Sequence, residues 1–232
     1  VRKHLSQIKG GNLLKFTYPS KVHCLILSDV IGDDLSSISS GLTSPDPTTF
    51  SKTKEILLKY KIWKKIPTKV QTYIKKGIKN KELETPKKNN KIFSNVKNSI
   101  IGSNYLCIKS IHDLCKDNKV HSKIWFKNIE MDVIKLSLNF YERLKKQNIK
   151  KPTMLISGGE TTVNIKGKGK GGRNQEFALH FLKIMKSKLP KQKYFLLSAG
   201  TDGRDGPTNA AGAIINDQTH KSLKHNSINL EK

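Results

Sequence analysis

Short apolar runs alternate with amphipathic stretches along most of this 232-residue chain, and this alternation limits the folds that it can adopt. The runs VHCLIL (22–27) and YFLL (194–197) have the length and composition of buried strands. The stretches KTKEILLKYKIW (52–63) and TKVQTYIKKGI (68–78) place apolar residues at helical spacing. Such alternation predicts an α/β protein whose sheet is covered by helices on both faces.

The second half of the chain continues the helical pattern. We expect helices near 105–116 and 174–188, and a third helix between them whose apolar face carries Ile134, Leu138 and Tyr141. Further strands are expected at SIIG (99–102), near HSKIWF (121–126), in PTMLISGGE (152–160) and at TTVNIK (161–166).

The segment TPKKNNK (85–91) interrupts this pattern. It is polar and charged, and it begins with a threonine and a proline. Such composition is typical of a connection between compact regions. The sequence therefore predicts a linker here, with one domain on each side.

The net charge of +26 raises the question of a nucleic-acid partner. Only four of the 44 cations are arginines, although base and phosphate recognition favours the planar guanidinium. The lysines are spread over every segment, without a tract of interleaved aromatic residues. We interpret them as a solvated surface with nonspecific affinity for polyanions, and we expect no specific nucleic-acid partner.

The remaining composition favours a cytoplasmic protein. No apolar run reaches the roughly 18 residues of a membrane span, so no membrane partner is expected. Cys24, Cys107 and Cys115 are odd in number and lack CxxC spacing, which is typical of reduced cysteines in the cytosol. No secretory or transit pattern follows Val1.

Three loops rich in Asp, Gly and Ser each follow a predicted strand: SDVIGDD (28–34), SGGE (157–160) and SAGTDGRDGPT (198–208). Loops at the carboxyl ends of parallel strands meet at one edge of a sheet, so we expect these loops to lie together. Glycine amides can approach an anion closely. Ordinary turn chemistry is the alternative, because these residue types are common in turns. Carboxylates in two of the loops offer the hard oxygen atoms that magnesium prefers: Asp29, Asp33, Asp34, Asp202 and Asp205.

The stretch NIKGKGKGGRNQEF (164–177) contains a glycine loop. Gly167, Gly169 and Gly172 match the spacing GxGxxG between a predicted strand and a predicted helix, as in dinucleotide-binding loops. Such loops also require an acidic residue about 20 positions later to bind the ribose, and 189–197 contains none. The dinucleotide interpretation is therefore disfavoured.

The same loop suits a polyphosphate better. Lys166, Lys168, Lys170 and Arg173 stand beside glycine amides, at the partly positive N-terminus of the predicted helix. No GK[ST] sequence follows, so this is not a Walker A loop. A solvated basic turn without a ligand remains the alternative.

Five segments of the chain, taken in order, closely resemble the type II glycerate 2-kinases: VRKHLSQIKGG (1–11), SDVIGDDLSSISSGLTSPDPTTF (28–50), SGGETTV (157–163), GKGKGGRNQEFAL (167–179) and LSAGTDGRDGPTNAAGA (197–213). The combination is highly specific, although it covers the lysine-rich middle (51–150) poorly. Two positions depart from the family pattern. Leu42 replaces a proline, and Asn209 replaces an aspartate, which removes one carboxylate.

The resemblance implies an enzyme that uses ATP and Mg²⁺ to phosphorylate D-glycerate on its 2-hydroxyl. It also implies an α/β fold of two Rossmann-like three-layer domains with a cleft between them, the first domain being incomplete. Residues 1–84 would form the C-terminal part of the first glycerate kinase domain. Residues 85–91 would be the linker, and 92–232 the second, MOFRL-type domain without its C-terminal end. We expect such an internal fragment to be inactive on its own, and we leave a homodimer open as its oligomeric state.

Roles can be assigned to charged residues in the resembling segments. Arg173 is expected to bind the transferring phosphoryl group or the glycerate carboxylate, because a guanidinium binds either bidentately. Lys9 is the second catalytic cation. Asp202 is expected to orient the hydroxyl or to hold magnesium, with Asp29, Asp34 and Asp205 as other metal ligands, and Glu160 is the alternative base. The residues expected to bind substrate or phosphate are Ser157, Gly158, Gly159, Glu160, Gly167, Gly169, Gly171, Gly172, Thr201 and Gly203.

Two other functions remain open at this point. Some members of the resembling family carry the label hydroxypyruvate reductase, so an NAD(P)H-dependent reductase is one alternative. A noncatalytic anion-binding module is the other.

Overall fold

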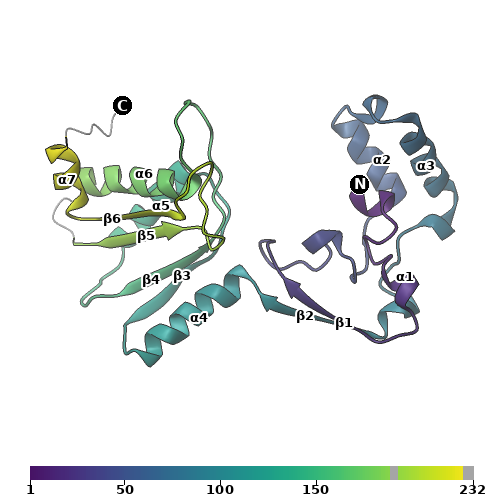
Figure 1. Ribbon diagram of the computed structural model, residues 1–232, viewed down its shortest axis with the longest axis horizontal. Helices are drawn as coiled ribbons and strands as arrows, with labels where there is room; N and C mark the ends of the chain where they lie inside the picture. Colours follow the sequence, from purple (N-terminus) through teal and green to yellow (C-terminus); the bar gives the residue numbers. More distant parts are fainter. Residues whose placement is uncertain (189–192, 227–232) are drawn as a thin grey trace. The chain divides into compact units, whose positions relative to one another are not determined.

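The computed structural model describes residues 1–188 and 193–226, which divide into two compact units (Figure 1). The first unit is Val1–Cys107 and the second is Ile108–Lys232. Both contain helices and strands, so the chain has the mixed α/β character that the sequence predicts. Within the described residues, each helix is too short or too polar to cross a lipid bilayer.

The first unit contains short helices, long connecting loops and one pair of parallel strands, β1 and β2. Its elements in chain order are η1 (Arg2–Leu5), α1 (Leu14–Thr17), β1 (Val22–Leu27), η2 (Ile38–Ser40), α2 (Phe50–Lys59), η3 (Trp63–Lys65), α3 (Thr68–Lys79), η4 (Lys81–Leu83), η5 (Lys91–Phe93) and β2 (Val96–Gly102), where η denotes a short 3-10 helix.

The core of the first unit lies between α2 and α3. Phe50, Leu57 and Ile74 are buried together there. Phe50 also meets the ring of His4 edge-on at a centroid distance of 4.7 Å, which joins η1 to this core. In α3, Gly77 gives the Phe50 ring its space, because a Cβ at Gly77 would lie 2.6 Å from ring atoms.

The segment 85–91, predicted to be a linker, lies inside the first unit. Thr85 is buried, and its hydroxyl donates a hydrogen bond to the carboxylate of Asp46. The division between the two units falls later in the chain, between Cys107 and Ile108. The boundaries predicted from the sequence, 1–84, 85–91 and 92–232, describe domains of the resembling family and stay a prediction.

In its described residues, 108–188 and 193–226, the second unit combines four helices with two pairs of strands. Its elements are α4 (Asn104–Asp117), which begins just before the division, then β3 (Ser122–Ile129), α5 (Val133–Lys145), β4 (Met154–Gly159), α6 (Arg173–Lys188), β5 (Phe195–Ala199), β6 (Gly212–Asn216) and α7 (Thr219–His225). Strands β3 and β4 are parallel, whereas β5 and β6 are antiparallel.

Helices pack on both faces of the β3–β4 pair. On one face, α4 packs through a small cluster, and on the other face α5 and α6 form the main core (Figure 1). The small cluster consists of Ile108, Cys115, Ile124 and Ile156. Aromatic rings dominate the main core: Trp125, Phe126, Phe140, Phe177 and Phe181.

The β5–β6 pair differs from the sequence prediction of a sheet covered on both faces. Leu196 and Ile215 pack into the main core, but Phe195, Leu197 and Ile214 on the other face are each at least 60 % exposed. Strand residues alternate between faces, so one face of this pair is buried and the other is an exposed apolar surface.

Two local predictions were wrong. TTVNIK (161–166) forms no strand and contributes only an isolated bridge between Thr162 and Asp132. In α5, Ile134 and Leu138 are exposed, although Tyr141 is buried as expected. The buried face of α5 instead carries Val133, Leu136, Ser137, Phe140 and Tyr141. Two overlapping apolar patterns at helical spacing exist in this helix, and the aromatic core around Phe140 determines which of them is buried.

Candidate functional site

The start of α6 brings two of the predicted loops together in the second unit. Arg173 is the first residue of the helix, and its Nη1 donates a charge-assisted hydrogen bond to Oε1 of Glu160, just after β4. The two side chains are 44 % and 53 % exposed, so this ion pair is accessible to a solvated ligand. A guanidinium in this position can exchange one carboxylate for another anion.

The loop after β5 also reaches the start of α6, through the carboxylate of Asp205. Asp205 is only 2 % exposed. Its Oδ1 accepts hydrogen bonds from N and Nδ2 of Asn174, both at 3.1 Å. Its Oδ2 accepts from N and Nε2 of Gln175, at 2.9 and 3.1 Å. Each carboxylate oxygen therefore has two N–H donors.

These four donors keep Asp205 ionised. Burial alone would raise its pKa, but hydrogen bonds from the amides of Gln175 and Asn174 outweigh burial, and the pKa is lowered. The negative charge also lies at the positive end of the helix dipole, where it is stabilised.

This arrangement corrects one part of the sequence interpretation. The polyphosphate was expected at the N-terminus of the helix, but the amides of Asn174 and Gln175 already donate to Asp205. The groups left for an anion are the guanidinium of Arg173, the exposed lysines of the loop and the glycine amides before the helix.

The glycines of the glycine loop and of the loop after β5 fall into two classes. A Cβ on Gly172 would lie 2.3 Å from Cγ of Asp205, and one on Gly206 would lie 2.1 Å from the carbonyl oxygen of Gly171. A Cβ on Gly169 or Gly171 would meet nothing within 4 Å, and one on Gly167 only a backbone nitrogen at 3.9 Å. Gly172 and Gly206 thus allow the two loops to touch, while the other three leave the loop surface open.

The SGGE loop after β4 contributes close backbone packing and one polar group. Gly159 has a φ of 140°, and a Cβ there would lie 2.1 Å from the amide nitrogen of Ile129. Gly158 is partly buried. The hydroxyl of Ser157 is buried and has no hydrogen-bond partner among the described residues. A buried hydroxyl without a protein partner is uncommon, and a ligand or water can satisfy it.

Thr201, Asp202 and Gly203 form an exposed turn in the loop after β5. Gly203 has a φ of 78°, and its amide donates to the carbonyl of Gly200 at 3.0 Å. Oδ1 of Asp202 accepts from the amide of Arg204 at 3.2 Å. The Asp202 carboxylate is therefore oriented by the turn while it remains accessible to solvent.

The other predicted site residues lie in the first unit. Nζ of Lys9 donates to the carbonyl of Ser39 at 3.3 Å. Asp34 accepts hydrogen bonds from the hydroxyls of Ser37 and Ser36, at 2.6 and 2.8 Å, and these bonds lower its pKa. Asp29 is exposed just after β1.

Two loops with left-handed backbone hold Lys9 in place. Gly10 and Gly11 have φ values of 64° and 81°, and their amides donate to the carbonyls of Ser40 and Gly41. Ser39 and Ser40 also have positive φ, at 49° and 62°. Such residues cost roughly 1–3 kcal/mol each and persist where surrounding contacts enforce them, often at functional sites.

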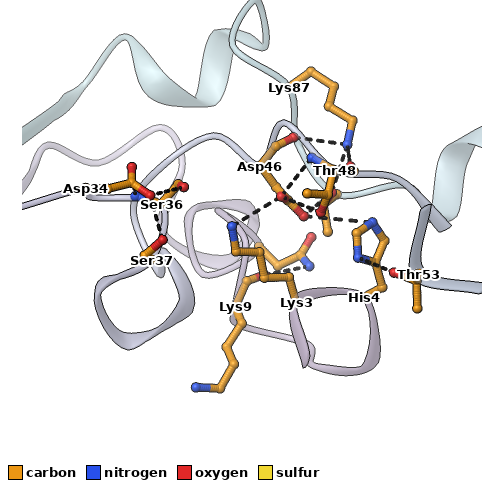
Figure 2. A network of polar contacts seen from close by, with 12 residues as sticks. Lys3, His4, Lys9, Asp34, Ser36, Ser37, Asp46, Thr48, Thr53 and Lys87 are labelled. Carbon is orange, nitrogen blue, oxygen red and sulfur yellow. Dashed lines mark hydrogen bonds and ion pairs between the residues drawn. The ribbon is translucent and has the colours of Figure 1, made fainter. Parts of the chain in front are cut away.

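A buried polar network supports these loops, and sequence reasoning missed it (Figure 2). Its centre is Asp46, only 1 % exposed, which accepts hydrogen bonds from Lys3, Thr48 and Thr85. A Cβ on Gly10 would lie 3.3 Å from Oδ2 of Asp46, so the carboxylate packs directly under the glycine loop.

His4 and Glu84 extend the network. Nε2 of His4 lies 2.9 Å from Oε1 of Glu84 and 3.8 Å from Oδ2 of Asp46, and its Nδ1 lies 3.2 Å from the hydroxyl of Thr53. Lys87 completes it by donating to the backbone carbonyls of Asp46 and Thr48. The network thus ties η1 and α2 to the segment 84–87.

One sequence signal could have identified Asp46. Asp46, Pro47 and Thr48 form the pattern of an Asx turn, in which an aspartate accepts from the amide two residues later, here at 3.0 Å. The partners His4 and Glu84 are 80 residues apart in the chain. No local pattern indicates such a pair.

The predicted metal ligands do not form a preassembled cluster. Within 1–188 and 193–226, no group of three or more His, Cys, Asp or Glu side chains is arranged to hold a metal ion. Of the predicted ligands, Asp29 and Asp202 present accessible carboxylates, whereas the oxygens of Asp205 are fully engaged with amides.

Two family models match the chain. The model described as a domain of unknown function, DUF4147, matches residues 1–75. The MOFRL family model matches residues 153–232.

Curated relatives match along nearly the whole chain. A glycerate 2-kinase of Pyrococcus horikoshii is 37 % identical over 238 residues, covering 100 % of this chain and 52 % of the relative. A D-glycerate 2-kinase of Thermotoga maritima is 38 % identical, covering 97 % and 51 %. A mouse glycerate kinase is 31 % identical, covering 93 % and 48 %. The chain therefore spans about half the length of the curated relatives it matches.

Solved structures agree with these matches. The crystal structure of glycerate kinase from Thermotoga maritima superimposes with a TM-score of 0.84 at 36 % identity, covering all of this chain and 53 % of that chain. A Pyrococcus horikoshii structure superimposes with a TM-score of 0.79 at 36 % identity, covering 99 % and 52 %.

The contact between Gly172 and Asp205 predicts unequal effects of two alanine substitutions. Gly172→Ala is expected to lower stability by about 1–3 kcal/mol, because its Cβ would overlap the buried carboxylate. Gly169→Ala is the matched control in the same loop and is expected to change stability by less than about 0.5 kcal/mol. Thermal melting of the intact protein measures both. Equal melting temperatures would contradict the close contact between the two loops.

The network around His4 predicts loss of stability at acid pH. Burial lowers the pKa of His4, so the unfolded chain takes up this proton first, and stability falls as pH drops below about 6.5. Asp46 is buried and Glu84 is partly buried, but hydrogen bonds outweigh burial and lower the pKa values of both carboxyl groups, so further stability is lost below about pH 4.

Urea unfolding between pH 8 and pH 3 measures this dependence. His4→Gln is expected to remove the change in slope near pH 6.5. His121→Gln, at an exposed histidine, is the control and is expected to keep it. An unchanged profile in His4→Gln would show that His4 does not carry the acid sensitivity.

Proposed function

Because the chain belongs to the glycerate kinase family, we propose that the whole protein is a glycerate 2-kinase. It transfers a phosphoryl group from ATP to the 2-hydroxyl of D-glycerate and releases 2-phosphoglycerate and ADP. The observation that carries the proposal is the start of α6, where an accessible arginine stands beside a basic loop with open glycines.

The proposed role of Arg173 follows from its position. Phosphoryl transfer depends mainly on positioning and on neutralising charge in the transition state. Arg173 binds either the transferring phosphoryl group or the glycerate carboxylate. Its present partner, Glu160, has the same charge as such a carboxylate and accepts a hydrogen bond from the guanidinium. When the anion binds, Glu160 is released and becomes available as a base, its alternative role.

The glycine loop supplies the remaining phosphate contacts. The Cα positions of Gly167, Gly169 and Gly171 have open space beside them through which a ligand can approach, and the neighbouring lysines add positive charge. Ser157 offers its unpartnered hydroxyl, with the backbone of Gly158 and Gly159 beside it. Besides Arg173, the glycine loop and the SGGE loop, we propose that the exposed turn of Thr201 and Gly203 also contacts the ligand.

We propose Asp202 as the residue that orients the 2-hydroxyl or contacts magnesium. Magnesium in kinases is held by one or two carboxylates together with substrate phosphates and water, so a preassembled protein cluster is not required. When bound, the ion neutralises phosphate charge. Asp202 fits this use because its carboxylate is exposed, and Asp29 and Asp34 remain the proposed ligands from the first unit.

Lys9 is the proposed second cation. Its backbone is held by the glycine pair Gly10 and Gly11, whereas its ammonium group makes one exposed hydrogen bond to Ser39. A lysine with a fixed backbone and a lightly held head group can turn to a negative ligand at little energetic cost.

The finer architecture is also a proposal for the whole protein. We propose two three-layer α/β domains of the Rossmann type, with the first unit contributing to the first domain. The partners are D-glycerate and the nucleotide, the compartment is the cytoplasm, and a homodimer is left to experiment.

Coupled assays on the full-length protein test the function. We expect consumption of ATP with D-glycerate and Mg²⁺, followed as ADP formation. We expect no oxidation of NADH or NADPH with hydroxypyruvate, because 189–197, about 20 positions after the glycine loop, contains no acidic residue to bind a ribose. Nicotinamide oxidation without ADP formation would favour the reductase, and the absence of both activities would favour an anion-binding module.

Substitution of Arg173 tests the site. Arg173→Lys keeps the positive charge but loses the planar fork, so it is expected to lower transition-state stabilisation by about 2–4 kcal/mol. Lys168→Gln, an exposed cation in the same loop, is expected to cost less than about 1 kcal/mol. Both are read from kcat/KM of the full-length enzyme after its melting temperature is checked. Retention of more than half the parent kcat/KM by Arg173→Lys would exclude Arg173 from the site.

A further inference from the structure

We propose that Asp205 is a positioning residue that fixes the backbone at Arg173 and so presents its guanidinium to the anion. This role replaces the metal-ligand role considered for Asp205 from the sequence. The inference rests on the proposed function, since it assumes that Arg173 binds the anion.

The contacts of Asp205 flank Arg173 on both sides in the chain. After the arginine, the backbone amides and side-chain amides of Asn174 and Gln175 all donate to the carboxylate, at 2.9–3.1 Å. Before the arginine, Gly172 packs so closely that a Cβ would overlap Cγ of Asp205. Gly172, Asn174 and Gln175 therefore all contact the same buried carboxylate, on both sides of Arg173 in the chain.

Neighbouring side chains brace this arrangement. The hydroxyl of Thr208 donates to the carbonyl of Asp205 at 2.7 Å and accepts from Nε2 of Gln175 at 3.1 Å. The hydroxyl of Ser198, in β5, donates to Oδ1 of Asn174 at 2.8 Å. The start of α6 is thus tied to a strand of the sheet as well as to the loop after it.

Asp205 makes more contacts than a helix cap requires. Asp132 caps α5 by accepting two backbone N–H groups, from Ile134 and Lys135. Asp205 accepts two backbone N–H groups and also two side-chain N–H groups, and it is almost fully buried. A cap determines where a helix begins, whereas four donors on two oxygens also determine how the first turn is oriented.

Replacement by asparagine would disturb this orientation. An asparagine presents one oxygen and one NH₂ group, so the two donors that now face the second oxygen would meet another donor. The backbone beside Arg173 would then shift, and a displacement of about 1 Å in a site can lower activity by about 100-fold.

A double-mutant cycle in the full-length protein tests the inference. We expect Asp205→Asn to lower kcat/KM for D-glycerate by about 10–100-fold. In the Arg173→Lys background, the same change is expected to lower it by less than about threefold, because Asp205 acts through the arginine. Asp132→Ala removes the aspartate cap from α5 and is expected to lower the melting temperature while kcat/KM stays within about twofold of the parent.

The pattern of effects decides between positioning and simple structural support. Non-additivity of the two substitutions supports the positioning role. Full additivity, or a loss of kcat/KM in Asp132→Ala equal to that in Asp205→Asn, overturns it. If Asp205→Asn does not fold, Gln175→Met takes its place in the cycle, since it removes one side-chain donor to Oδ2 and leaves the carboxylate intact.

A binding measurement separates this inference from the proposed function. If the parent phosphorylates no D-glycerate, the proposed function fails, and the same cycle is measured by calorimetry with inorganic pyrophosphate as the anion. If Asp205→Asn raises the Kd for pyrophosphate much less in the Arg173→Lys background than in the parent, the positioning role is still supported. Additive effects, or no binding of pyrophosphate by the parent, overturn it.

Discussion

The contact between the carboxylate of Asp205 and the first turn of α6 determines how the second unit presents its charged groups. An ionised carboxylate that is almost fully buried is unfavourable unless every lone pair has a donor, and Asn174 and Gln175 supply four N–H groups. This requirement explains why an asparagine and a glutamine follow the arginine. It also explains why Gly172 must lack a side chain, since the carboxylate occupies that space. Arg173, between these residues, has a fixed backbone and an accessible guanidinium.

The first unit uses a similar device. Asp46 is buried beneath the glycine pair Gly10–Gly11, and its donors come from η1, from its own turn and from the segment 84–87. The residues that this network supports are Lys9, which is partly exposed, the exposed Ser39 and the buried Ser40, both serines having left-handed backbone. In each unit, a buried carboxylate that accepts several hydrogen bonds thus stabilises loops that carry accessible charged groups. Rigid support beneath accessible polar groups is what binding and catalysis require of a protein scaffold.

Sequence reasoning predicted the parts of this structure that depend on local patterns. The mixed α/β class, strand β1 and the extent of α6 follow from apolar spacing. The anion-binding role of the glycine loop, inferred from its composition, stays a prediction. Features set by distant contacts were missed. The buried face of α5 depends on the aromatic core, and the pairing of His4 with Glu84 joins residues 80 positions apart. Asp205 was recognised as an important acid, but its partners were not, because nothing in the loop sequence indicates that α6 begins against it. The catalytic roles given to Arg173, Lys9 and Asp202 stay predictions.

A crystal structure of the full-length protein with Mg²⁺, ADP and D-glycerate would test the central claim most directly. The claim is that Asp205 holds the first turn of α6 while Arg173 exchanges Glu160 for the anion. We predict that the guanidinium of Arg173 contacts a phosphate or the glycerate carboxylate, and that all four N–H donors of Asn174 and Gln175 remain on Asp205. An anion bound to the backbone amides of Asn174 and Gln175 with Asp205 displaced would contradict it. So would a complex in which Arg173 contacts neither ligand.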